Sequence, residues 1–132
     1  MIRVAIVEDE SITRRSIALA LRAEGFEVFE AADAFAARSL LRSQEVDVVL
    51  LDLGLPRING YEVCRRVRAK PWGRDVTLVA LTGWGQEEDR RKSHDAGFDG
   101  HLVKPVEYAA LVTLIDAAVA ARRGAHAVAS KH

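Results

Sequence analysis

Four polar groups in this sequence each follow a short apolar run that has the character of a β-strand. They are Glu8–Asp9, Asp52, Thr82 and Lys104. If the runs form one parallel sheet, these groups lie together at its carboxyl edge, where α/β proteins place their ligand sites. Clustered carboxylates repel one another, so the acidic members favour a bound cation. Oxygen ligands favour a hard ion such as Mg²⁺, which can also bridge to phosphate.

The other members of this set are suited to phosphoryl chemistry. A lysine ammonium and a threonine hydroxyl can hold phosphate oxygens, and an aspartate can be the nucleophile that forms an acyl phosphate. Positioning and charge neutralisation are most of what phosphoryl transfer needs from a protein. Each group alone also has a simpler explanation. Asp52 can be a turn residue, and the acids after the first strand can be favoured there by a helix dipole.

The run Val48–Leu51 is the centre of the predicted fold. It is almost continuously apolar, which indicates a strand buried on both faces, and Gly54 and Pro56 end it directly after Asp52. The other expected strands are Ile2–Val7, Phe26–Glu30, Val76–Leu81 and Asp99–Val103. Strands that alternate with helices predict a doubly wound α/β sheet.

Five helices are expected between and after these strands. They are Ser11–Ala23, a helix capped by Asp33, a helix that begins at Asn59, Gln86–Ala96, and Val106 to about Arg122. The fourth helix is mostly charged, so we expect it to be weakly anchored and mobile, although such a run can also be a plain solvated face. We expect residues 1–123 to form one domain and residues 124–132 to be a disordered tail.

The composition restricts the class of protein. The 132 residues include 19 basic and 19 acidic side chains, and this zero net charge argues against a nucleic-acid-binding module. No apolar run reaches membrane-spanning length, and Glu8 makes the N-terminus acidic too early for a signal peptide. The single cysteine, Cys64, rules out a disulfide framework and is expected in the core. We therefore expect a cytoplasmic protein without membrane or nucleic-acid contacts.

Five motifs occur along the chain in a specific order. They are Val7-Glu8-Asp9, Leu51-Asp52-Leu53-Gly54-Leu55-Pro56, Asn59-Gly60-Tyr61-Glu62, Ala80-Leu81-Thr82-Gly83, and Gly97-Phe98-Asp99-Gly100-His101-Leu102-Val103-Lys104-Pro105. In this order they resemble the receiver domain of two-component response regulators, and the last motif is similar to receivers of hybrid histidine kinases. The resemblance implies a flavodoxin-like (βα)5 fold with strand order 2-1-3-4-5, and a Lys–Pro bond that is often cis.

The resemblance also implies a ligand set and a partner. A sensor or hybrid histidine kinase, or a histidine phosphotransfer protein, would transfer a phosphoryl group to Asp52. Glu8 and Asp9 would assist Mg²⁺, with Asp9 the more direct ligand, together with Asp52 and the backbone carbonyl of Gly54. The chain would be a signalling module with only intrinsic phosphotransfer and autodephosphorylation, either as a stand-alone receiver or as a fragment of a longer protein.

Three further residues would couple the site to a surface. The resemblance makes Thr82 the hydroxyl switch and Lys104 the ion-pair partner of the phosphate. The responsive surface would be the helix 86–96, the strand 99–103 and the helix 106–122, which would contact a partner or a second copy of the chain. His101 stands where the family usually has Tyr or Phe. Strand alternation turns it away from Lys104 and toward the flanking helices, so it either reports the state of the site or is a bystander.

Other functions fit parts of the pattern. A phosphohydrolase of the aspartate-nucleophile class would usually have a second aspartate at the position of Gly54. A flavin or nucleotide module would need a Gly- or Ser/Thr-rich first loop, where this chain has Glu8-Asp9-Glu10. A receiver that no longer accepts phosphate would lack part of the acid, hydroxyl and lysine set, which is complete here. The sequence therefore favours a phosphoacceptor domain.

Overall fold

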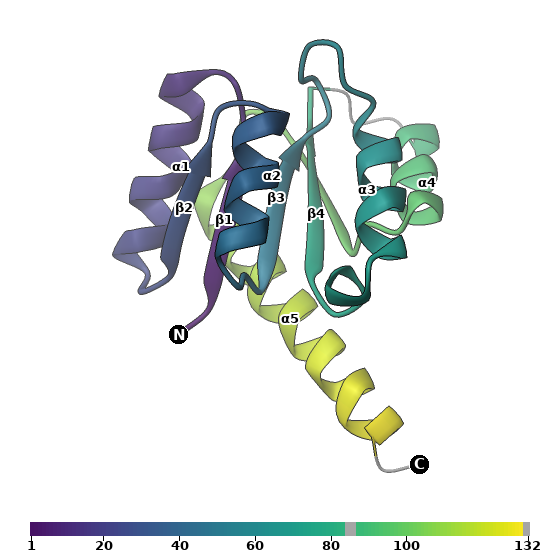
Figure 1. Ribbon diagram of the computed structural model, residues 1–132. Coiled ribbons are helices and arrows are strands. Elements are labelled where there is room, and N and C mark those ends of the chain that lie inside the picture. The colour runs from purple at the N-terminus through teal and green to yellow at the C-terminus, as the bar shows by residue number, and fades with distance from the viewer. Residues whose placement is uncertain (84–86, 131–132) are drawn as a thin grey trace.

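The computed structural model describes residues 1–83 and 87–130, with side chains for 1–83 and 91–124. Strands and helices alternate along that part of the chain (Figure 1). The strands are β1 (Arg3–Val7), β2 (Glu27–Ala31), β3 (Val48–Asp52), β4 (Thr77–Thr82) and β5 (Gly100–Val103). The helices are α1 (Ser11–Ala23), α2 (Ala34–Ser43), α3 (Gly60–Ala69), α4 (Glu87–Ala96) and α5 (Tyr108–Ser130), with a 3₁₀ turn η1 (Pro71–Gly73) after α3.

The sheet has the strand order β2-β1-β3-β4-β5, and every neighbouring pair is parallel. The expected fold class and strand order are thus confirmed, and the strand bounds differ from the expected ones by at most one residue. The register places Asp52 opposite Leu81 and Thr82 opposite Val103. The carboxyl ends of β1, β3, β4 and β5 therefore line one edge of the sheet.

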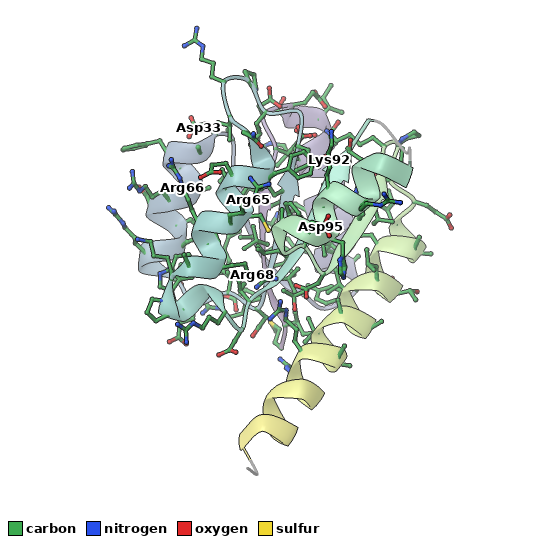
Figure 2. All side chains as sticks on the ribbon, turned by 90° about the vertical axis from the view of Figure 1, so that its right-hand side faces the viewer. Asp33, Arg65, Arg66, Arg68, Lys92 and Asp95 are labelled. Carbon is green, nitrogen blue, oxygen red and sulfur yellow. The ribbon has the colours of Figure 1, made fainter. Side chains whose placement is uncertain are left out.

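Helices cover both faces of the sheet (Figure 1). Buried residues of α1 and α5 pack with Val48 and Leu50 on one face, while buried residues of α2, α3 and α4 pack with Val49 and Leu51 on the other. Adjacent strand residues point to opposite faces, so this alternation explains why the whole of β3 before Asp52 is apolar. In the side view, α3 lies between α2 and α4 (Figure 2).

Polar side chains cap the first turns of three helices. Asp33 accepts a hydrogen bond from the Ala36 N–H at 2.7 Å, and Asn59 accepts from the Tyr61 N–H at 3.0 Å, so both are the caps that the sequence predicts. Glu10 caps α1 by accepting from the N–H groups of Ile12 and Thr13. This contact directs Glu10 to the helix and leaves the two preceding acids available to the sheet edge.

The last helix differs most from the sequence prediction. It begins at Tyr108 and continues to Ser130, past the expected end at Arg122. Residues 124–130, which we expected to be disordered, are therefore helical, and residues 131–132 lie outside the described part of the chain. The segment is rich in alanine, the strongest helix former, and needs no apolar stripe to be helical. The final turns of α5 project away from the sheet (Figure 1). The expected domain boundary at residue 123 stays a prediction.

The described side chains of the fourth helix, from residue 91 onward, are mostly exposed. Ser93 and Ala96 are buried, whereas the other side chains from residue 91 to residue 95 are exposed, and Figure 2 shows Lys92 and Asp95 on this helix. The expected first residue, Gln86, lies outside the described residues, and α4 begins at Glu87. The mobility of α4 stays a prediction.

Within the described part of the chain, no helix combines the length and apolar character needed to span a membrane.

Candidate functional site

Three carboxylates meet at the carboxyl edge of the sheet. Glu8 and Asp9 follow β1, and Asp52 is the last residue of β3, the strand that pairs with β1. One carboxylate oxygen from each residue lies within 4.8 Å of the others. Glu8 and Asp52 are buried and Asp9 is exposed, so the cluster opens to solvent on the Asp9 side. The parallel topology thus brings together acids that are far apart in the sequence.

A lysine reaches this cluster from the far side of β4. The Nζ of Lys104 donates to Glu8 Oε1 and lies 3.2 Å from Asp52 Oδ1. The backbone N–H of Lys104 donates to the carbonyl of Thr82 at 2.7 Å, which holds the end of β5 beside the end of β4. The Lys104–Pro105 peptide bond is cis. One residue therefore contacts both buried carboxylates and the strand that ends in Thr82.

The turn after β3 approaches the Asp52 carboxylate closely. The Gly54 N–H donates to Asp52 Oδ1 at 2.9 Å, so this aspartate is a turn residue as well as a member of the acidic cluster. A Cβ atom on residue 54 would lie 3.3 Å from the same oxygen, which is a tight contact. The described contact uses the Gly54 N–H, and the role of its carbonyl as a metal ligand stays a prediction.

The two buried carboxyls differ in their affinity for a proton. Burial raises the pKa of Glu8 to about 7, and the adjacent Asp52 carboxylate adds to this against the opposing effect of Lys104. Burial also acts to raise the pKa of Asp52, but the neighbouring Glu8, the hydrogen bond from the Gly54 N–H and the charge of Lys104 outweigh it and lower that pKa. Burial likewise opposes charge on Lys104, yet its contacts with the two acids raise its pKa. At neutral pH, Asp52 and Lys104 are ionised and Glu8 is partly protonated.

Thr82 is the last residue of β4, and His101 lies on the neighbouring strand β5. Thr82 is buried at the end of β4, between the strands that carry Asp52 and Lys104. The Nδ1 atom of His101 lies 3.0 Å from the Oγ atom of Ser93 on α4, so the imidazole is directed to a flanking helix. Sequence reasoning did not identify Ser93. The available signal was a small polar residue within a run of charged residues.

The acidic cluster fits a hard cation. The second carboxylate oxygen of Glu8, Oε2, is buried and has no hydrogen-bond partner among the described residues. A buried acceptor without a partner costs free energy unless a proton or an ion satisfies it. Three carboxylates beside one ammonium also leave the cluster negative when all of them are ionised. Glu8, Asp9 and Asp52 are therefore the residues that would hold such an ion.

Comparison with known proteins agrees with this geometry. The family model of the response regulator receiver domain matches residues 4–116. The chain belongs to this family. The receiver is 34% identical over 115 residues to the phosphate regulon transcriptional regulatory protein PhoB of Escherichia coli, a match that covers 87% of this chain and 50% of that protein. The chain thus spans about half the length of this curated relative.

Solved structures show the same fold. The chemotaxis response regulator CheY4 of Vibrio cholerae has a TM-score of 0.83 and 26% identity, and the match covers 89% of this receiver and 98% of that chain. The receiver domain of the sensor histidine kinase PA1611 from Pseudomonas aeruginosa has a TM-score of 0.79 and 31% identity, covering 89% and 97%. That structure is described with a magnesium ion coordinated in its active-site cleft.

We expect the stability of the metal-free receiver to fall as pH rises through the range in which Glu8 ionises. The pKa of this carboxyl is ordinarily 4.5 and is raised to about 7 in the folded protein, so its contribution is complete below pH 4.5 and is lost as pH passes through about 7. The lowered pKa of Asp52 affects stability only at more acidic pH, below its ordinary value of 3.8. The free energy of unfolding should decrease by roughly 1–3 kcal/mol over this range.

Urea unfolding in a chelating buffer measures this decrease. Glu8→Gln should make the free energy of unfolding nearly constant between these pH values, because the amide does not titrate. Glu24→Gln, a change of the same kind at an exposed residue, is the control and should retain the wild-type slope. Equal slopes for Glu8→Gln and the wild type would show that Glu8 does not have the raised pKa.

Proposed function

We propose that this receiver accepts a phosphoryl group on Asp52 from a phosphohistidine of a histidine kinase or histidine phosphotransfer protein. The observation that carries the proposal is the contact of a buried, ionised Asp52 with the Lys104 ammonium at 3.2 Å, beside the other two acids. This combination supplies a nucleophile and a cation for the phosphate oxygens in one place. The membership of this chain in the receiver family supports the same function.

The proposed transfer is a displacement at phosphorus. A carboxylate oxygen of Asp52 forms the new bond to phosphorus as the bond to the imidazole nitrogen of the donor breaks, and the imidazole leaves with its electron pair. The lowered pKa of Asp52 keeps this oxygen deprotonated at neutral pH. Lys104 is placed to bind an oxygen of the transferred group, because its ammonium already contacts the nucleophile. Intrinsic hydrolysis of the acyl phosphate is part of the proposal.

The proposed cofactor is Mg²⁺. Glu8, Asp9 and Asp52 would hold it, with Asp9 as the exposed and most accessible ligand, and the Gly54 carbonyl is a predicted further ligand. The ion supplies charge neutralisation of the transferring phosphoryl group. The oxygen-only donor set and the buried, unsatisfied Glu8 Oε2 support this choice of a hard cation. The magnesium ion described in the receiver of PA1611 supports it as well.

Phosphorylation is proposed to act on the surface formed by α4, β5 and α5. Lys104 continues β5, and its N–H binds the carbonyl of Thr82, so a change at the phosphate can reach both strand ends. His101 on β5 contacts Ser93 on α4, which links the strand to a buried side chain of that helix. We infer that Thr82 moves toward the phosphoryl group and that His101 follows. The surface would then bind a partner or a second copy of the receiver, in the cytoplasm and without nucleic-acid contacts.

We expect Lys104→Ala to accept a phosphoryl group but to respond weakly to it. The ammonium stabilises the phosphorylated state in particular, and a ligand shifts a conformational equilibrium only by its differential affinity for the two states. Amide chemical shifts of α4, β5 and α5 should therefore change on phosphorylation by less than half of the wild-type change. Lys70→Ala, at an exposed lysine after α3, should behave as the wild type. If Lys104→Ala shows the same chemical-shift changes as the wild type, Lys104 does not couple the phosphoryl group to this surface.

The proposed function is tested by incubation with acetyl phosphate and Mg²⁺ followed by intact-mass measurement. The receiver should gain one phosphoryl group, and a chelator should prevent the gain. No gain with Mg²⁺ present, or several groups per chain, would contradict the proposal.

A further inference from the structure

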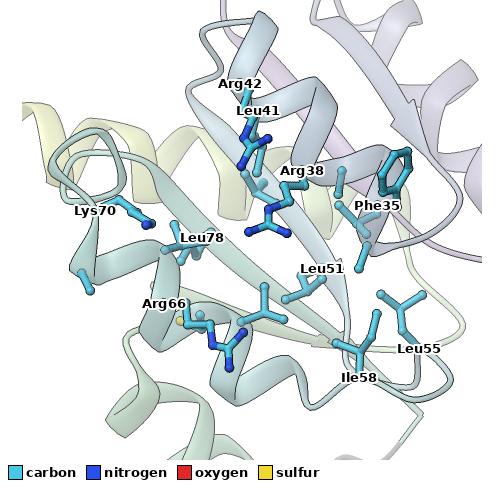
Figure 3. Close-up of a pocket in the computed structure, with 18 of the residues that line it drawn as sticks. Phe35, Arg38, Leu41, Arg42, Leu51, Leu55, Ile58, Arg66, Lys70 and Leu78 are labelled. Carbon is cyan, nitrogen blue, oxygen red and sulfur yellow. The ribbon is translucent and has the colours of Figure 1, made fainter.

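A cavity of about 820 Å³ lies between α2 and α3 (Figure 3), and the acids Glu8, Asp9 and Asp52 are not among its lining residues. Its floor is the sheet face under these helices and includes Val49 and Leu51 of β3 and Leu78 of β4, which are almost fully buried. The volume is in the range of ligand sites, roughly 300–1,000 Å³. Nothing in the proposed phosphoryl transfer uses this cavity, which we call the α2–α3 groove.

Two rows of cations border the groove. Arg38 and Arg42 come from α2, and Arg66 and Lys70 come from α3 and the residue after it (Figure 3). Arg38 and Arg42 are four residues apart on α2, so they lie one above the other on the same side of that helix. Lys70 directly follows α3 and lies four residues after Arg66. All four are exposed, and none of the described lining residues is acidic. Arg66 has one exposed ion pair, at 3.5 Å from Glu62, and no ion pair of the other three is found among the described side chains.

Exposed aromatic side chains also line the groove. Phe35, in the first turn of α2, is 80% exposed, and Trp72, in the turn after α3, is 50% exposed. Both helices run back from the carboxyl edge of the sheet, so these two residues lie toward opposite ends of the groove. Large aromatic residues and arginines are enriched among the residues that dominate binding energy at protein interfaces. The groove therefore combines two exposed aromatic side chains with partly exposed apolar walls that include Leu41, Val63 and Val67.

We propose that the α2–α3 groove binds an amphipathic helix of a partner protein whose apolar stripe is flanked on both sides by Asp and Glu. Helices of ten residues border the groove and give it a length of about 15 Å, which is nearly three turns of a bound helix. The apolar stripe would pack against the partly exposed apolar side chains of the groove walls, Leu41, Val63 and Val67, between the two aromatic residues. The acidic flanks would face the two cation rows, which is the mode of a helix in a groove.

The charge pattern decides among possible occupants. Four cations in two rows require several negative charges on both sides of the occupant, whereas a single-chain fatty acid carries one carboxylate. A second copy of this receiver that docked through its own groove would bring the same cation rows against each other and would be repelled. The groove is separated from α4 by α3, so the bound helix would not use the surface proposed to respond to phosphorylation (Figure 2).

The test uses a synthetic helical peptide with Leu at i, i+3, i+4 and i+7 and Glu at the flanking positions. A second peptide has Lys in place of every Glu. Fluorescence anisotropy should show that the Glu peptide binds at least about tenfold more tightly than the Lys peptide, because several weak ion pairs add and the Lys peptide meets repulsion. On binding, amide signals of α2 and α3 and the indole N–H signal of Trp72 should shift.

Two protein variants locate the binding. The double variant Arg38→Glu/Arg42→Glu should bind the Glu peptide about tenfold more weakly than the wild type does. Arg15→Glu reverses a charge on α1, at the other face of the sheet, and should leave the affinity for the Glu peptide unchanged. The double variant should still be phosphorylated by acetyl phosphate, which separates this inference from the proposed function. Three results would each overturn the inference: equal affinity for both peptides, no saturation by the Glu peptide at millimolar concentration, or chemical-shift changes confined to other helices. Tight, Arg38-dependent binding of dodecanoate without peptide binding would also overturn it.

Discussion

Asp52→Asn should remove the phosphoryl group that acetyl phosphate and Mg²⁺ add to the receiver. The amide has no negative charge and is not a nucleophile toward phosphorus, so we expect the adduct to fall below detection, a loss of at least about a hundredfold. Among the described residues, Asp52 is the carboxylate that combines burial, a lowered pKa and contact with Lys104. Neighbouring acids should therefore not replace it.

The control for this variant is Asp33→Asn. It makes the same chemical change at the exposed cap of α2, and asparagine caps helices as well as aspartate does, so the fold should be unaffected. Its adduct should equal that of the wild type. An undiminished adduct in Asp52→Asn would show that another residue accepts the phosphoryl group.

Asp9→Ala should strongly weaken Mg²⁺ binding. Asp9 is the exposed acid of the cluster, so its carboxylate is the one that can meet an entering ion without first being uncovered. Loss of a residue that only orients a metal ligand costs roughly 10–100-fold in affinity, so loss of a direct ligand should cost at least about tenfold. Isothermal titration calorimetry measures this directly. Trp84, the tryptophan that follows Thr82 most closely in the sequence, lies outside the described residues.

The matched control for this second variant is Glu10→Gln. Glu10 follows Asp9 directly, but its carboxylate accepts hydrogen bonds from the first turn of α1. Its Mg²⁺ affinity should stay within about twofold of the wild type, because a side-chain amide oxygen can still cap the helix. The same affinity in Asp9→Ala as in the wild type would place the metal ligands elsewhere.

The sheet and the main members of the site could be predicted from the sequence, because each depends on local signals. The apolar run Val48–Leu51 followed by Asp52 and Gly54 indicates a buried strand with a polar end, and the structure has that strand. Parallel topology then dictates that strand-end residues share an edge. Helix caps such as Asp33 and Asn59 are also local, since each contacts backbone N–H groups within three residues.

Other features depend on packing or direction, which the sequence pattern does not contain. Three consecutive acids follow β1, and only the structure separates Glu10, which caps α1, from Glu8 and Asp9 in the cluster. The helix beyond Arg122 has no apolar periodicity, so a pattern based on core packing missed it. The α2–α3 groove arises from the spacing of two helices over the sheet. No residue type in either helix predicts that spacing.

The central claim is that Asp52 carries the phosphoryl group, and chemical mapping of that group tests it most directly. Borohydride reduces an acyl phosphate to an alcohol and so marks the phosphorylated carboxyl permanently. After reaction with acetyl phosphate and Mg²⁺, reduction and proteolysis, peptide mass spectrometry should find homoserine at position 52 and unmodified side chains at Glu8 and Asp9. A reduced side chain at either of those acids, with Asp52 intact, would contradict the account.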